Sequence, residues 1–149
     1  MPEPDLSRFI VILCGAEESA NVGSVCRAMK TMGLSRLVLA ACPDFDEERV
    51  RTLAVHAAEL YESARRFPSL AEALEKTSLS AGFTRRRGER RKSFSMDVAS
   101  FARDAWGRPG GDVALVFGNE RSGLSAEELD LCSLAVHIPT SEAFPSLNL

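Results

Sequence analysis

The sequence is poor in the side chains that build metal centres and disulfides. It holds two histidines and four cysteines, and no two cysteines form a Cys-x-x-Cys pair. Cys14, Cys26, Cys42 and Cys132 stand far apart in apolar surroundings, which is typical of buried free thiols rather than of metal ligands. We therefore expect no metal site, reduced cysteines and a cytoplasmic protein.

Long apolar runs and catalytic signatures are also lacking. No stretch approaches the roughly 20 apolar residues that cross a membrane, and the acidic start, M-P-E-P-D, does not have the pattern of a signal peptide. Neither G-x-G-x-x-G nor G-x-x-x-x-G-K-[ST] occurs, which argues against a dinucleotide fold and a P-loop. No Ser-His-Asp set or pair of acid–base carboxylates is evident.

Charge is distributed unevenly along the chain. The 149 residues carry a net charge of −3, with 45% apolar and 26% charged residues, as expected for one soluble globular domain spanning residues 1–149. Yet six of the eight residues 85–92 are Arg or Lys. A solvated charge run and a loop that binds phosphate both fit this segment. Because the rest of the chain is acidic, the concentration of positive charge slightly favours nucleic acid.

The order of apolar segments predicts an α/β fold. Phe9–Cys14 is a continuous apolar run, a helical period begins at Asn21 and ends at Gly33, and Arg36–Ala40 is a second apolar run. A strand, a helix and a strand within about thirty residues indicate a parallel sheet with right-handed crossovers. Four more strands, about six in all, are expected at 60–62, 79–83, 113–117 and 133–138.

Three candidate capping boxes predict helix starts between these strands. They pair Asp44 with Glu47, Ser69 with Glu72, and Ser125 with Glu128. The first helix is expected to run to Ala57, the second through Glu75 and the third to about Leu131, with a further helix at 97–106. Because ligands bind beyond the carboxyl ends of parallel strands, the polar loops 82–85, 118–123 and 139–148 are candidate binding segments.

Two of the polar positions invite a functional interpretation. Arg27 lies opposite the apolar stripe that Val22, Val25, Cys26, Met29 and Met32 form on the predicted helix. Spacing alone favours a solvated arginine over a cation that meets a phosphate or a reacting oxygen. In loop 118–123, Gly118 would let a ligand approach the backbone and Glu120 could accept hydrogen bonds from a ligand or from Asn21. The alternative is a plain loop between a strand and a helix, in which Gly123 is needed only for the turn.

Three segments together resemble a known family. Residues 21–29 (N-V-G-S-V-C-R-A-M), 115–124 (L-V-F-G-N-E-R-S-G-L) and 138–149 are similar to the three ordered motifs of the SpoU/TrmH branch of SPOUT RNA methyltransferases. The similarity runs from about Phe9 to the end of the sequence. Residues 29–34 (M-K-T-M-G-L) are most similar to the TrmJ-like tRNA ribose methyltransferases.

The resemblance implies an α/β trefoil-knot fold, a homodimer, and methyl transfer from S-adenosylmethionine to a ribose 2′-hydroxyl of RNA. The substrate it suggests is the anticodon loop of tRNA, with ribosomal RNA as the alternative. By position, Arg27 would be the catalytic arginine, braced by Asn21 and Glu120. The cofactor would be bound by Phe83, Thr84, Arg85, Gly118, Ile138, Ser146, Leu147 and Asn148. The basic loop would grip RNA through Arg86, Arg87, Arg90, Arg91 and Lys92.

Physical chemistry qualifies two parts of this expectation. A guanidinium stays protonated at neutral pH and is a poor general base, so Arg27 is expected to orient the ribose or neutralise a phosphate. The family also continues after Ser-Leu-Asn with a long helix that completes the knot, for which this chain leaves no room. We therefore expect a domain truncated at that helix. A knotted RNA-binding domain without catalysis and a small-molecule-binding α/β domain are the competing interpretations.

Overall fold

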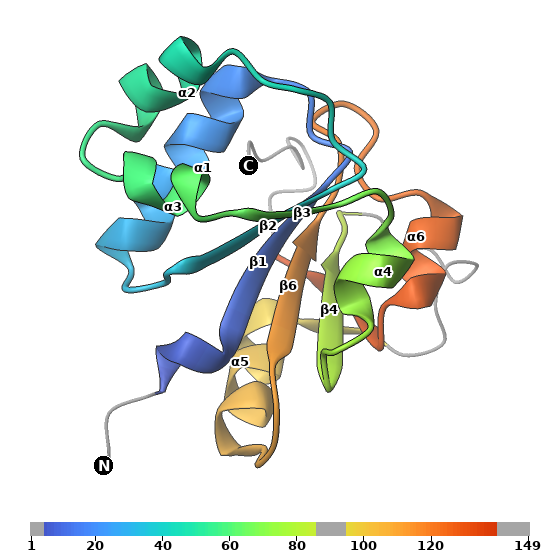
Figure 1. The fold of residues 1–149 in the computed structure, drawn as a ribbon. Helices are drawn as coiled ribbons and strands as arrows, with labels where there is room; N and C mark the ends of the chain where they lie inside the picture. The colour runs from blue at the N-terminus through green and yellow to red at the C-terminus, as the bar shows by residue number, and fades with distance from the viewer. Residues whose placement is uncertain (1–4, 86–94, 140–149) are drawn as a thin grey trace.

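The computed structural model describes residues 5–85 and 95–139, which form a parallel sheet with helices on both faces (Figure 1). The strands are β1 (Phe9–Cys14), β2 (Arg36–Ala40), β3 (Arg65–Phe67), β4 (Leu79–Phe83), β5 (Ser95–Asp97), β6 (Val113–Phe117) and β7 (Leu134–His137). The helices are η1 (Leu6–Arg8), α1 (Ser19–Thr31), α2 (Glu47–Ala54), α3 (Ala58–Glu62), α4 (Leu70–Leu74), α5 (Val98–Gly107) and α6 (Ala126–Leu131). The predicted parallel α/β fold is confirmed.

The strand order places distant parts of the chain side by side. The sheet runs β3-β2-β1-β6-β4-β7-β5, and each pair of neighbours is parallel. The chain moves outward from β1 to β3 and then crosses to the other half of the sheet. β1 leads into α1 on one face, whereas β6 leads into α6 on the other. In open α/β sheets, ligands bind beyond the carboxyl ends of neighbouring strands where such a change of face occurs.

Strand β1 lies at the centre of the core because its apolar side chains are buried on both faces. Val11 and Leu13 pack in the cluster of α1, α2 and α3, whereas Ile10 and Ile12 pack in the cluster of α4 and α6. Figure 1 shows these two groups of helices on either side of the sheet. Helix α5 covers β4 and β7 through Phe101 and belongs to a third cluster. The continuous apolar run of β1 thus reflects burial on both faces.

The peripheral strands are where the sequence-based prediction was wrong. Residues 60–62 are not a strand but part of α3, and the strand β3 follows three residues later. Two of the three residues of β3, Arg65 and Arg66, are exposed, so this edge strand carries no apolar pattern. The short strand β5 was also missed. The described ranges therefore hold seven strands instead of about six.

Helix boundaries were predicted with mixed success. Ser69 is the N-cap of α4, and Ser125 with Glu128 forms the predicted capping box of α6. The box at Asp44 is wrong, because Asp46 caps α2 by accepting a hydrogen bond from the Arg49 amide at 3.2 Å. Phe45, between the two acidic residues, is buried in the core and fixes the chain just before the helix. Helix α2 also ends at Ala54, three residues earlier than predicted, and α1 begins at Ser19 rather than at position 21.

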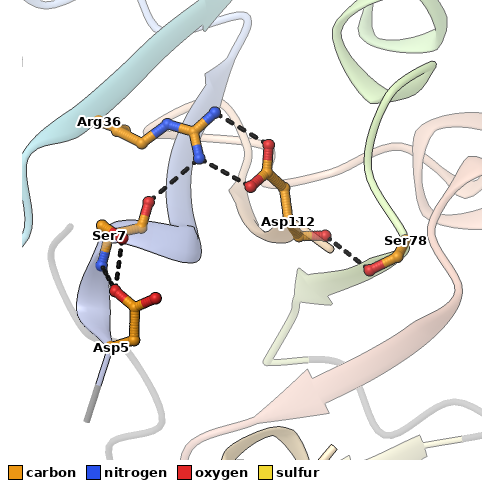
Figure 2. Close-up of polar contacts among 5 residues, drawn as sticks. All are labelled: Asp5, Ser7, Arg36, Ser78 and Asp112. Carbon is orange, nitrogen blue, oxygen red and sulfur yellow. Dashed lines mark hydrogen bonds and ion pairs between the residues drawn. The ribbon is translucent and has the colours of Figure 1, made fainter. Parts of the chain in front are cut away.

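A network of polar contacts lies at the amino-terminal ends of the central strands. Arg36, at the start of β2, donates to both carboxylate oxygens of Asp112 at 2.8 and 2.9 Å and to the Ser7 carbonyl at 3.1 Å (Figure 2). Ser78 Oγ donates to the carbonyl oxygen of Asp112 at 3.1 Å. These contacts link the starts of β1, β2, β4 and β6. The candidate binding loops follow the opposite, carboxyl-terminal ends of the strands.

We expect Asp112→Asn to lower the free energy of unfolding at pH 7 by about 1 kcal/mol, the upper end for partly exposed pairs. The Arg36 hydrogen bonds hold the pKa of Asp112 below its usual range. The stabilisation is therefore present above the unfolded pKa of about 3.9 and is lost as pH falls through the lower folded pKa. Urea denaturation at pH 7 and near pH 2.5 measures this difference. Asp104→Asn, in an exposed pair with Arg108 four residues away, is the control and should cost less.

Candidate functional site

The three strands that lead into the predicted binding segments lie side by side in the sheet, with their carboxyl ends at the same edge. Strand β4 lies between β6 and β7, with Gly82 opposite both Val116 and Ala135. The chain leaves β4 at Phe83, and the Thr84 amide donates to the Val136 carbonyl at 2.9 Å, so the first segment is tied to β7. The predicted cofactor residues Phe83, Thr84, Arg85, Gly118 and Ile138 thus follow three adjacent strand ends.

An aromatic pair lies at this edge. The rings of Phe83 and Phe117 stack with centroids 4.6 Å apart and planes inclined by 16°. Both side chains are half-buried, and both are on the face of the sheet that carries α1 and α5. Phe117 was not among the candidate site residues predicted from sequence. Its place follows from the register, because Val116 opposes Gly82 and the next residues of the two strands are therefore neighbours.

Loop 118–123 is closed by its own backbone. Asn119 and Gly123 exchange two hydrogen bonds of 3.3 and 2.8 Å. A Cβ atom on Gly118 would lie 2.2 Å from the Gly123 carbonyl carbon and 2.3 Å from the Leu124 nitrogen, so no larger residue fits there without moving the loop. Gly118 is therefore required by the close packing of the loop backbone.

Glu120 connects this loop to the start of α1. Its carboxylate accepts hydrogen bonds from the backbone amides of Glu17 and Glu18 at 3.0 to 3.1 Å. The partners suggested from sequence were a ligand or Asn21, whereas these amides lie just before the helix. Glu18, the N-cap of α1, makes no side-chain capping bond, so Glu120 supplies a negative charge that favours this helix end.

Helix α1 presents Arg27 on its solvent-facing side. Val22, Val25, Cys26 and Met29 are buried as predicted, but Met32 is 67% exposed because α1 ends at Thr31 and Met32 lies beyond the helical repeat. Arg27 is exposed and Asn21 is half-buried. They are six positions apart, or about 9 Å along the helix axis. Asn21 therefore lies in the first turn, near the amides that Glu120 binds, and Arg27 lies further along α1.

Several predicted residues lie outside the described ranges. They are the RNA-binding candidates Arg86, Arg87, Arg90, Arg91 and Lys92 and the cofactor-binding candidates Ser146, Leu147 and Asn148. Arg85, the last described residue before the basic segment, is exposed. The truncation predicted at the knot helix concerns the same final segment and stays a prediction.

None of the four cysteines is in a disulfide. Cys14, Cys26 and Cys132 are buried and Cys42 is half-buried. Burial raises the pKa of Cys26 to about 11, and burial with a hydrogen bond to Glu128 raises the pKa of Cys14 further. Within residues 5–85 and 95–139, no group of His, Cys, Asp and Glu is arranged to hold a metal ion, and no helix is long and apolar enough to cross a membrane.

A parallel sheet with helices on both faces defines an α/β protein, and in such proteins ligands bind beyond the carboxyl ends of the strands. The chain belongs to the SpoU rRNA Methylase family, whose sequence model matches residues 8–149. The resemblance found in the three motifs is thereby confirmed.

Individual relatives agree with this membership. Over 147 residues the chain is 38% identical to the tRNA (cytidine/uridine/adenosine-2′-O-)-methyltransferase TrmJ of Pseudomonas aeruginosa, covering 97% of this chain and 56% of that protein. The crystal structure of TrmJ from Z. mobilis is similar with a TM-score of 0.86 at 28% identity, over 93% of this chain and 62% of that one.

A third relative has been solved with a cofactor. The SpoU methyltransferase AviRb from Streptomyces viridochromogenes, in complex with AdoMet, is similar with a TM-score of 0.71 at 26% identity, over 99% of this chain and 60% of that one. The chain therefore spans less than two thirds of the length of each of these three relatives.

Proposed function

We propose that this chain is the catalytic domain of an S-adenosylmethionine-dependent methyltransferase that modifies a ribose 2′-hydroxyl of tRNA, with the anticodon loop as its target. The observation that carries the proposal is the arrangement of the motifs. Glu120 of the loop after β6 binds the start of α1, which bears Arg27. The carboxyl ends of β4 and β7 come next in the sheet, on the side of β6 away from β1. A single domain over residues 1–149, a homodimer and a cytoplasmic location belong to the same proposal.

The described residues fit a cofactor that is part nucleoside and part amino acid. A half-buried aromatic pair, with the half-buried Thr84 and the exposed Arg85 and Ile138 at neighbouring strand ends, offers the mixed apolar and polar lining that such ligands need. Phe83, Thr84, Arg85, Gly118 and Ile138 would hold it, together with Ser146, Leu147 and Asn148. When bound, S-adenosylmethionine supplies a methyl group on a sulfonium that needs no further activation.

The role of Arg27 would be electrostatic. An exposed guanidinium is accessible to RNA and can donate hydrogen bonds to a phosphate or a ribose oxygen, but it does not readily accept a proton. Arg27 would orient the 2′-oxygen in line with the methyl group, and positioning of this kind accounts for a large part of many enzymatic rates. Asn21 and Glu120 would fix the first turn of α1 and so place Arg27.

The basic segment would bind the RNA backbone. We expect replacement of Arg86, Arg87, Arg90, Arg91 and Lys92 by Gln to weaken RNA binding and to flatten its dependence on salt. For each phosphate that the variant no longer neutralises, the slope of log K against log[salt] should become shallower by about 0.7 to 0.9. Binding measured at several salt concentrations tests this prediction, with Arg49→Gln on the exposed face of α2 as the control. An unchanged slope in the five-residue variant would assign RNA binding to another surface.

The proposed function is tested by two linked assays. Calorimetric titration should show S-adenosylmethionine binding to the protein, and labelled cofactor should transfer methyl groups to RNA. Separate incubations with tRNA and with ribosomal RNA distinguish the proposed substrate from the alternative that the family description favours. Binding of RNA without any methyl transfer would instead support the knotted RNA-binding domain.

A further inference from the structure

We propose that Asn119 is a positioning residue for methyl transfer, because its side chain fixes the loop after β6 to the end of β1. The proposal rests on the proposed function, since it assigns Asn119 a part in placing the cofactor loop relative to Arg27. Asn119 lies between Gly118, a candidate cofactor residue, and Glu120, which binds the start of α1. It was not among the residues selected from sequence.

The Asn119 side chain uses its donor and its acceptor at the same time. Nδ2 donates to the Gly15 carbonyl at 2.9 Å, and Oδ1 accepts from the amides of Arg121 and Ser122 at 2.9 and 3.2 Å. Gly15 is itself anchored, because its amide donates to the Ala40 carbonyl of β2 at 2.9 Å. The half-buried side-chain amide of Asn119 therefore links the loop after β6 to the carboxyl ends of β1 and β2.

This link controls where the next side chain lies. The Glu120 carboxylate accepts hydrogen bonds from the Glu17 and Glu18 amides. The backbone that carries Glu120 is held in place by the hydrogen bond from Asn119 to the Gly15 carbonyl. Helix α1 begins at Ser19, directly after those amides, and carries Arg27. If the link is broken, the loop and the helix can shift relative to each other. A displacement of about 1 Å between reacting groups can cost on the order of 100-fold in rate.

Asn119→Asp tests the link with little change in shape. An aspartate still accepts from the Arg121 and Ser122 amides, but its carboxylate cannot donate to the Gly15 carbonyl and repels that oxygen. We expect kcat to fall by about 10- to 100-fold while the affinity for S-adenosylmethionine stays close to that of the wild type. Ser122→Ala is the matched control, because its hydroxyl also contacts Asn119 Oδ1, at 3.3 Å, without joining the loop to β1. This control should retain wild-type turnover.

Hydrogen exchange provides a readout that does not depend on catalysis. Amides 17–22 should exchange faster in Asn119→Asp than in Ser122→Ala or the wild type, measured without RNA or cofactor. Unchanged exchange or unchanged kcat in Asn119→Asp would overturn the proposal. So would a parallel loss of kcat, cofactor affinity and melting temperature, which indicates a general structural role. If the wild type transfers no methyl group, the proposed function fails separately, and faster exchange would still support the link between the loops.

Discussion

Replacing Arg27 by alanine should reduce kcat for methyl transfer by on the order of 10²–10³-fold, the usual loss when one donor to a reacting oxygen is removed. The affinity for S-adenosylmethionine should hardly change, because the described candidate cofactor residues lie at the ends of β4, β6 and β7 and not on α1. Stability should also be preserved, since Arg27 is exposed and its removal opens no cavity. Single-turnover kinetics with saturating cofactor measure the effect.

A lysine at position 27 separates charge from geometry. Arg27→Lys keeps the positive charge but loses the planar fork that can donate two parallel hydrogen bonds. Its rate should lie between those of the wild type and Arg27→Ala if orientation matters. Neighbouring Lys30→Ala is the control, because this residue also projects from α1 but pairs with Glu59 and the His56 carbonyl. Turnover retained in Arg27→Ala would refute the catalytic assignment.

Gly118→Ala should have the second large effect. The added methyl group would lie 2.2 to 2.5 Å from backbone atoms of Gly123 and Leu124, which cannot move without opening the loop. We expect cofactor affinity to fall at least tenfold, or about 1.4 kcal/mol in binding free energy, because the loop would no longer present its backbone at the strand end. Calorimetric titration measures this loss, and circular dichroism checks that the sheet remains folded.

Gly123→Ala is the matched control in the same loop. Gly123 has φ of +68°, but a Cβ atom there meets no atom within 4 Å. The substitution should cost about 1 kcal/mol in stability from the left-handed backbone and should leave cofactor binding largely intact. Equal cofactor affinity in Gly118→Ala and the wild type would show that closure of this loop is unrelated to the cofactor.

The central fold could be predicted because burial leaves a pattern in the sequence. β1, β2, β4 and β6 have the bounds expected from their apolar residues. The edge strand β3 could not be predicted, because Arg65 and Arg66 face solvent and only its hydrogen bonds to β2 make it a strand. The helix at 58–62 was mistaken for a strand because five residues are too few to show a helical period.

The site could be predicted only in part from the sequence. The motifs selected Glu120 and Gly118, but the partners of Glu120 are backbone amides, and such partners leave no trace in residue types. Asn119 was missed for the same reason, since it binds a carbonyl of Gly15, which is 104 residues away in the chain. Phe117 resembled an ordinary strand residue until the register of β4 and β6 placed it beside Phe83.

The most direct test is to identify the atom that receives the methyl group. Unfractionated tRNA would be incubated with the protein and labelled S-adenosylmethionine, digested to nucleosides and mapped by mass spectrometry. The proposed function predicts a 2′-O-methylated nucleotide in the anticodon loop that is absent when Arg27→Ala replaces the wild type. A methyl group on a base, or the same ribose methylation by Arg27→Ala, would contradict it.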